Sequence, residues 1–283
     1  MALLNLDDVQ RLLDLEAVAA LLQRPLPVEP NSLAAWLNDE GITLPDGRGH
    51  YITYLGRRGY AVGFEGLVGH LNRVLPHSEV IQQSLRVDVA MYPEIALREL
   101  LANALIHQDF TVTGAGPMVE IYDDRIEVTN PGALLPGKKP DRLIGTTPES
   151  RNEKLASSFR RFRICEERGT GFQKIVQAIE LFGLPPLLLA PQENAFRVTL
   201  SAPRKFTEMS MRERVEAGYQ HAVLQYVSSQ TLTNTSLRQR FKLHEKHRNQ
   251  ITNLVGEAVD AGRIKRKDAG SGKKFAEYVP CWA

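Results

Sequence analysis

Three polar side chains recur at four-residue intervals in segment 93–107, which predicts a single helix. Glu99, Asn103 and His107 would share one polar stripe, beside an apolar face of leucine and alanine residues. A carboxylate and an amide one turn apart can hold a water molecule and a hydrated Mg²⁺, because both present oxygen atoms. Ordinary solvated helix faces show the same spacing, so a structural surface stays open as the alternative.

A second chemical candidate is the glycine pair Gly169 and Gly171, which with Thr170 comes directly before a predicted helix over 172–182. Glycines there let the backbone approach an anion, and the free N–H groups and dipole of a helix N-terminus favour phosphate. Lys174 stands where a dinucleotide-binding fingerprint needs its third glycine. The pattern therefore predicts a phosphate cradle or, as the alternative, an ordinary glycine turn.

The run from Gly132 to Lys139 matches the first seven positions of a phosphate-binding P-loop. Lys139 takes the place of the Ser or Thr that would hold Mg²⁺, and Pro140 follows in a segment without helical periodicity. We therefore exclude a P-loop.

The candidate site residues must be positioned by helices and strands, and the sequence predicts these in separate stretches of the chain. Helices are predicted over 7–22, 32–38, 64–74, 93–107 and 172–182. Strands are predicted around 50–55 and over 119–122, 125–129 and 195–200, the second and third forming a hairpin. Such a pattern is typical of the α+β class.

Composition and charge restrict the class of protein. The chain has 283 residues, two cysteines and a formal net charge of +2. No stretch approaches the roughly 18 uncharged apolar residues of a membrane helix, and two cysteines cannot form a disulfide framework. We expect a cytoplasmic protein with no membrane partner. The charge is uneven: residues 202–283 hold 15 Lys+Arg against 8 Asp+Glu, a balance of +7, which leaves −5 for residues 1–201.

The basic C-terminal part has the pattern of a winged helix. Helices are predicted over 211–228, 233–241 and 245–261, followed by strands over 263–267 and 273–279. Arginine, asparagine and threonine on the third helix suit base edges, and cations near the strands suit phosphates. A winged helix used only for protein contacts is the alternative. The predicted DNA-binding residues are Arg248, Asn249, Thr252, Arg266, Lys273 and Lys274.

Four sequence blocks in order carry a family resemblance. They are ELLANALIHQDF (99–110), VEIYDDRIEVTNPG (119–132), SRNEKLA (150–156) and CEERGTG (165–171). Together the blocks resemble the divergent GHKL, or Bergerat-fold, ATPase domains of the RecG-like, Schlafen/AlbA-associated ATP-binding regulators. The resemblance implies a Bergerat-type α/β sandwich followed by a winged helix-turn-helix, with ATP and Mg²⁺ as cofactors.

The resemblance also implies a role for each matching position. Glu99 would activate the attacking water, Asn103 would bind Mg²⁺, and residues 134–158 would form a lid over the ATP. Typical members have aspartate where this chain has Asn130, whose amide oxygen is a weaker acceptor, and they carry an AlbA-like domain that we expect to be lacking here. The implied nucleotide-binding residues are Asn103, Asn130, Gly132, Arg151, Asn152, Gly169, Thr170 and Gly171.

These observations predict three domains: a helical lead-in (1–56), a GHKL-like ATP-binding domain (57–205) and a winged helix (206–283). The predicted function is an ATP-binding regulator of double-stranded DNA, whose nucleotide state controls the winged helix. Hydrolysis of ATP as opposed to binding alone, and a homodimer as opposed to a monomer, stay open. The alternatives are a transcription factor with a vestigial nucleotide fold and a phage-defence or signalling component that acts through a protein partner.

Overall fold

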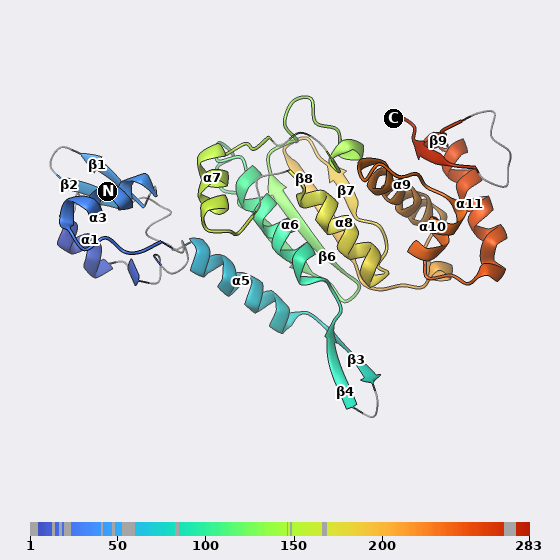
Figure 1. The fold of residues 1–283 in the computed structure, drawn as a ribbon, viewed down its shortest axis with the longest axis horizontal. Coiled ribbons are helices and arrows are strands. Elements are labelled where there is room, and N and C mark those ends of the chain that lie inside the picture. Colours follow the sequence, from blue (N-terminus) through green and yellow to red (C-terminus); the bar gives the residue numbers. More distant parts are fainter. Residues whose placement is uncertain are drawn as a thin grey trace. The chain divides into compact units, whose positions relative to one another are not determined.

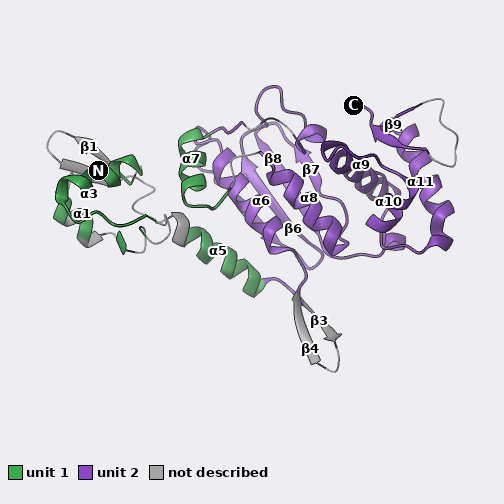
Figure 2. Cartoon of the chain, in the orientation of Figure 1, with its two compact units in different colours: residues 1–74, 152–166 green, residues 75–151, 167–283 purple. Residues whose placement is uncertain are grey.

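The computed structural model describes residues 5–12, 15–16, 19, 24–40, 42–46, 49–52, 60–82, 85–145, 147, 149–165, 169–268 and 276–283. Figure 1 labels the elements, and Figure 2 colours two compact units, one of residues 1–74 with 152–166 and one of residues 75–151 with 167–283. Helices and antiparallel strands confirm the predicted α+β class. The division into three domains stays a prediction; the second unit contains most of the predicted ATP-binding domain together with the predicted winged helix.

The first unit gathers helices from two distant parts of the chain. It holds α1 (Leu6–Leu12), α3 (Pro30–Asp39), the antiparallel pair β1 (Thr43–Asp46) and β2 (Gly49–Ile52), α5 (Tyr60–Val74) and α7 (Glu153–Arg161). Pro30 begins α3, where the missing N–H costs no helical hydrogen bond. Phe159 of α7 meets Phe64 of α5 edge-on, with ring centroids 6.1 Å apart. Most of residues 13–22 of the helix predicted over 7–22, and the end of the strand predicted around 50–55, lie outside the described residues.

The second unit is built on a four-stranded antiparallel sheet of order β5-β6-β8-β7. These strands are β5 (Met118–Ile121), β6 (Arg125–Pro131), β7 (Leu188–Pro191) and β8 (Ala195–Ser201). The predicted hairpin is confirmed, with Val119 opposite Val128. Strand β7 and the separate hairpin of β3 (His77–Gln82) and β4 (Leu85–Ala90) are not among the predicted elements.

Two helices lie side by side on the sheet, α6 (Glu94–His107) and α8 (Gly171–Phe182) (Figure 1). Leu97, Leu100 and Leu101 are the buried leucines of α6. Gly183, with a φ of 75°, ends α8 in the left-handed conformation that glycine adopts without strain. Both helices begin and end close to the predicted residues. Their buried apolar side chains hold them in place.

The C-terminal module, residues 206–283, follows β8. It contains the 3-10 turn η2 (Phe206–Glu208), α9 (Met211–Val227), α10 (Asn234–Arg240), the 3-10 turn η3 (Glu245–His247), α11 (Arg248–Asp260), β9 (Ile264–Arg266) and β10 (Tyr278–Pro280). Ser210 and Thr233 cap α9 and α10 with their side-chain oxygens. The predicted third helix is shorter than expected, because 245–247 form a 3-10 turn and the α-helix begins at Arg248.

Buried charges attach the C-terminal module to the end of α8. Arg240 is 5% exposed; its guanidinium donates to the Leu184 carbonyl at 2.7 Å, and its Nε lies 3.4 Å from Glu180 Oε1. His221 Nδ1 of α9 lies 3.0 Å from the other oxygen of the same carboxylate. Removing one member of such a cluster would leave an uncompensated charge in the interior, so the cluster fixes α9 and α10 relative to α8.

Candidate nucleotide site

The N-terminus of α8 lies directly against the polar stripe of α6. A Cβ atom on Gly171 would come within 3.0 Å of Glu99 Oε2 and 3.2 Å of Asn103 Nδ2. Contacts this short are tighter than a Cβ atom normally makes, so a residue larger than glycine would oblige the Glu99 and Asn103 side chains to shift. The structure thus brings together the two motifs that the sequence presented as separate candidates.

Glu99, the predicted catalytic acid, faces a lysine across this helix contact. Its Oε1 lies 3.5 Å from Lys174 Nζ, one turn into α8, and the carboxylate is only 12% exposed. Lysine at position 174 therefore does more than interrupt a glycine fingerprint, because it places a positive charge beside the carboxylate. No pattern in the sequence indicates this contact, because it joins two helices that are distant along the chain.

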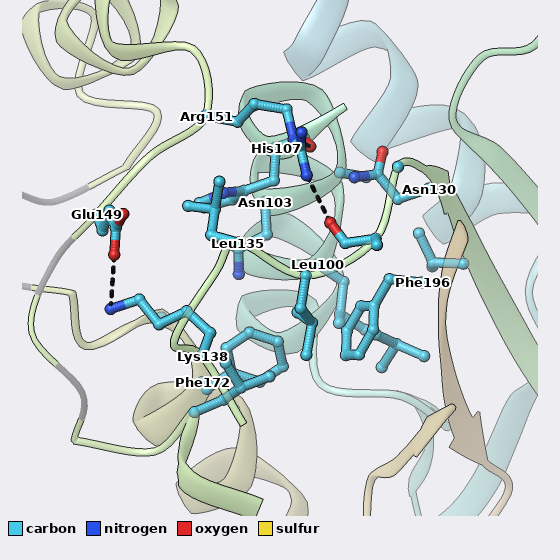
Figure 3. Close-up of a pocket in the computed structure, with 18 of the residues that line it drawn as sticks. Leu100, Asn103, His107, Asn130, Leu135, Lys138, Glu149, Arg151, Phe172 and Phe196 are labelled. Atoms are coloured by element: carbon cyan, nitrogen blue, oxygen red, sulfur yellow. Dashed lines mark hydrogen bonds and ion pairs between the residues drawn. The ribbon is translucent and has the colours of Figure 1, made fainter. Parts of the chain in front are cut away.

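A pocket opens next to Gly171 and is shown in Figure 3. It encloses about 970 Å³ of atom-free space, its open mouth included. The lining combines apolar side chains of α6, β6 and β8 with polar and charged side chains of α6, β6 and the chain between β6 and α7. Its lining includes Leu100, Asn103, Ala104, His107, Val128, Asn130, Gly132, Leu135, Lys138, Leu143, Thr147, Glu149, Arg151, Gly169, Gly171, Phe172, Phe196 and Val198.

Two amides in the lining have buried atoms without a hydrogen-bond partner in the described part of the chain. Asn130 is 8% exposed, and its Oδ1 is unpartnered; the same holds for Asn103 Nδ2. The oxygen and nitrogen of such an amide can exchange places by a flip of the side chain. Buried polar groups normally have partners, so unpartnered amides at a pocket indicate positions where a ligand or water completes the bonding.

A glycine turn after β6 shapes the rim of the pocket. Gly132 has a φ of 100°, and a Cβ there would lie 2.6 Å from Asp109 Cβ and 3.4 Å from the Arg151 guanidinium carbon. Arg151 binds three groups at once: the Asp109 carboxylate at 3.0 Å, the His107 carbonyl at 3.1 Å and the Ala133 carbonyl. Hydrogen bonds from Thr111 hold the pKa of Asp109 below its usual range, so the acid stays ionised as the partner of Arg151.

The part of the wall that carries Lys138 also carries an ion pair. Lys138 Nζ donates to the Thr147 carbonyl at 2.8 Å and lies 3.3 Å from Glu149 Oε2, as the dashed line in Figure 3 marks. Burial lowers the pKa of His107 from its ordinary value, and the charges of Arg151 and Lys138 lower it further. The imidazole in the pocket is therefore neutral at physiological pH, and it can accept or donate one hydrogen bond.

The predicted nucleotide residues fall into two groups. Asn103, Asn130, Gly132, Arg151, Gly169 and Gly171 line the pocket. Glu99 and Thr170 lie beside it without lining it, and Asn152 precedes α7 in the first unit. Lys138, His107 and Glu149 also line the pocket, although the sequence assigned them no site role. The sequence placed His107 on the polar stripe of its helix and Lys138 in the excluded P-loop run, and it gave no indication for Glu149.

The predicted DNA-binding residues lie in the C-terminal module or outside the described chain. Arg248 and Asn249 are exposed at the start of α11. Thr252 is exposed, but its hydroxyl already donates to the Arg248 carbonyl at 3.0 Å and accepts from Asn234. Arg266 is half-buried in β9, and Lys273 and Lys274 lie outside the described residues.

Comparisons with known proteins bear on the same part of the chain. Residues 114–200 match a family model described as "Putative ATP-dependent DNA helicase recG C-terminal", which supports an ATPase-like domain of the RecG-like group and suggests nucleotide binding. No curated protein matches the sequence. Among solved structures, the DIP2311 protein from Corynebacterium diphtheriae is similar, with 17% identity and a TM-score of 0.49, over 84% of this chain and 48% of that one. The chain thus spans about half the length of that protein.

Membrane-spanning helices and metal-binding clusters are both absent from the part of the chain that the structure describes. None of the described helices is long and apolar enough to cross a membrane. Within the same residues, no group of three or more His, Cys, Asp or Glu side chains could hold a metal ion.

We predict that Gly132→Ala disrupts the rim of the pocket. The new methyl group would collide with Asp109 at a φ that alanine rarely adopts, so the free energy of unfolding should fall by about 1–3 kcal/mol in urea titrations. Gly116→Ala is the matched control, because its Cβ would meet nothing within 4 Å. Equal stability of the two variants would contradict the role given to the turn.

Proposed function

We propose that the chain is an ATP-binding, DNA-binding regulator in which the nucleotide state of the ATPase-like domain controls the C-terminal module. The observation that carries the proposal is the pocket where the α8 N-terminus, Asn103 and Asn130 converge. In this proposal the ATPase-like domain has a Bergerat-type arrangement, in which α6 and α8 cover the sheet whose strand β6 carries Asn130. The C-terminal module is proposed to be a winged helix.

Each part of ATP has a chemically suited partner in this pocket. The apolar side chains of Leu100, Val128 and Phe196 suit the adenine ring, and the Asn130 amide can hydrogen-bond its edge. Gly169 and Gly171 present free N–H groups and a helix dipole to the phosphates. The unpartnered amides support the proposal, because a nucleotide would supply the missing hydrogen bonds.

The residues beside Gly171 also fit a magnesium ion. Oxygen atoms of Asn103 and the phosphates are the hard donors that Mg²⁺ prefers, and when bound the ion neutralises phosphate charge and polarises a phosphoryl oxygen. In a hydrolytic version of the proposal, Glu99 accepts the proton of the attacking water. Glu99 is paired with Lys174 and does not line the pocket. The main proposal is therefore ATP binding and not ATP hydrolysis.

A chain of contacts supports control of the C-terminal module by the nucleotide. The Tyr219 hydroxyl of α9 donates to the Asp141 carbonyl, which lies in the 3-10 turn η1 (Pro140–Arg142), and Trp282 Nε1 donates to that hydroxyl at 2.9 Å. Burial raises the pKa of Tyr219 to about 12, so the hydroxyl stays a donor. Two positions further along, Leu143 lines the pocket. A nucleotide that displaces Leu143 would therefore also displace the Asp141 carbonyl, which Tyr219 of α9 binds, and through Tyr219 would affect Trp282.

The same segment packs into the core of the C-terminal module. Ile144 is 8% exposed and belongs to the apolar cluster of α9, α10 and α11. A Cβ atom on Gly145 would come within 2.5 Å of Val227 Cγ1, so the chain passes close against α9. Protein interiors are close-packed and shift between discrete arrangements, which lets a small displacement at a pocket reach a neighbouring module.

DNA is the partner best suited to the charge of the C-terminal module. Residues 202–283, which contain this module, have a charge balance of +7, against −5 for residues 1–201, and DNA binding depends on phosphate neutralisation by Lys and Arg. Exposed Arg248 and Asn249 at the start of α11 carry side chains that read guanine and adenine edges. The alternatives, a vestigial nucleotide fold and a protein partner in place of DNA, become outcomes of the ATP and DNA titrations.

We predict that isothermal titration with ATP·Mg²⁺ gives saturable heat for the wild-type protein. Gly171→Trp should abolish it, because the indole would fill the contact with Glu99 and Asn103, whereas Glu99→Ala should preserve it. Gly116→Trp, a glycine with open space around it, controls for the bulk of the substitution. No heat with wild-type protein would favour the vestigial fold.

We predict that the C-terminal module binds duplex DNA with an affinity that falls as salt rises. Arg248→Ala and Lys274→Ala should each weaken binding and lower the slope of log K against log salt by about 1, because each variant neutralises one phosphate fewer. Lys154→Ala, an exposed lysine of α7, is the charge-matched control. Binding that is absent or independent of salt, measured by fluorescence anisotropy, would favour a protein partner.

A further inference from the structure

Lys138 is the one feature of the excluded P-loop run that brings a positive charge to the described pocket lining. Its side chain is 14% exposed, and its ammonium group contacts Thr147 and Glu149, both of which also line the pocket. Figure 3 shows Lys138 and Phe172, the residue after Gly171, among the side chains around the same cavity. A lysine in this place can therefore act on a ligand without any P-loop backbone.

Arg151, a second positively charged residue in the lining, already binds groups of the protein. It uses its guanidinium on the Asp109 carboxylate and on the carbonyls of His107 and Ala133. Those bonds tie the Gly132 turn to the end of α6, so releasing them would disturb the rim. Two groups that the Lys138 ammonium contacts, the Thr147 carbonyl and the Glu149 carboxylate, lie a few residues further along the chain. A lysine ammonium reorients easily on its flexible stem.

The partner of Lys138 is suited to being displaced. Glu149 is 52% exposed and carries one charge, and ion pairs of exposed groups contribute little stability. A polyphosphate carries several charges and more acceptor oxygens, so it competes successfully for the same ammonium group. A nucleoside without phosphates has nothing with which to compete.

We propose that Lys138 is a phosphate-binding residue of this pocket, and that Glu149 competes with the nucleotide phosphates for it. This inference rests on the proposed nucleotide binding and extends it to the polyphosphate part of the ligand. Nucleotide entry exchanges the Lys138–Glu149 ion pair for a Lys138–phosphate contact. The exchange makes the affinity for ATP, but not for adenosine, depend on both side chains.

The test is calorimetric titration of the full chain with ATP·Mg²⁺ and, separately, with adenosine. Lys138→Met should weaken ATP binding roughly tenfold or more, the loss expected for a hydrogen bond to a charged group, and should leave adenosine binding unchanged. Glu149→Gln should tighten ATP binding by about two- to fivefold, the range of an exposed ion pair. That gain should shrink at high salt and disappear in the Lys138→Met background.

Lys139→Met is the matched control, since Lys139 is the exposed neighbour that does not line the pocket. Equal ATP affinity of the Lys138 and Lys139 variants would overturn the inference, as would an equal loss of adenosine binding in Lys138→Met. If the Glu149→Gln variant bound ATP no more tightly than the wild-type protein, the proposed competition between Glu149 and the phosphates would be wrong. If the wild-type protein binds neither ligand, the proposed function itself fails, which is a distinct result.

Discussion

The contact between Gly171 and the α6 side chains is the constraint on which the rest of the site depends. A Cβ atom on Gly171 would approach Glu99 and Asn103 to 3.0 and 3.2 Å, so a larger residue at the start of α8 would oblige these two side chains to shift. The same helix contact brings Lys174 within 3.5 Å of Glu99, and Gly171 lines the pocket together with Asn103 and Asn130. Apolar packing of both helices on the sheet then holds the polar groups in place.

The same helix connects the pocket with the C-terminal module. One end of α8 carries Gly171, and the other carries Glu180, which meets His221 and Arg240 in the interior. The wall of the pocket is connected as well, since Tyr219 binds the Asp141 carbonyl and Ile144 enters the core of α9 and α11. Pocket and C-terminal module thus form one compact unit, whose two parts carry opposite net charge.

Local sequence patterns predicted the elements that position the site, and long-range contacts escaped them. Periodicity and the Gly183 stop located α6 and α8, and alternation located the β5–β6 hairpin. Strand β7 was missed because its sequence, LLAP, is short, lacks alternation and ends in proline. The packing of α7 in the first unit depends on the contact of Phe159 with Phe64, a residue far away in the sequence. The pairing of Glu99 with Lys174 and of Lys138 with Glu149 depends on how separate segments meet, which spacing along the chain does not reveal.

Coupling between nucleotide and C-terminal module can be followed at Trp282. The chain has two tryptophans; Trp36 is buried in the first unit, and the Trp282 ring lies 5.2 Å from the Arg142 guanidinium carbon. In Trp36→Phe protein, titration with ATP·Mg²⁺ should change the Trp282 emission saturably, with the dissociation constant found by calorimetry. Calorimetric binding of ATP with no change in that emission would contradict the coupling between the pocket and the C-terminal module.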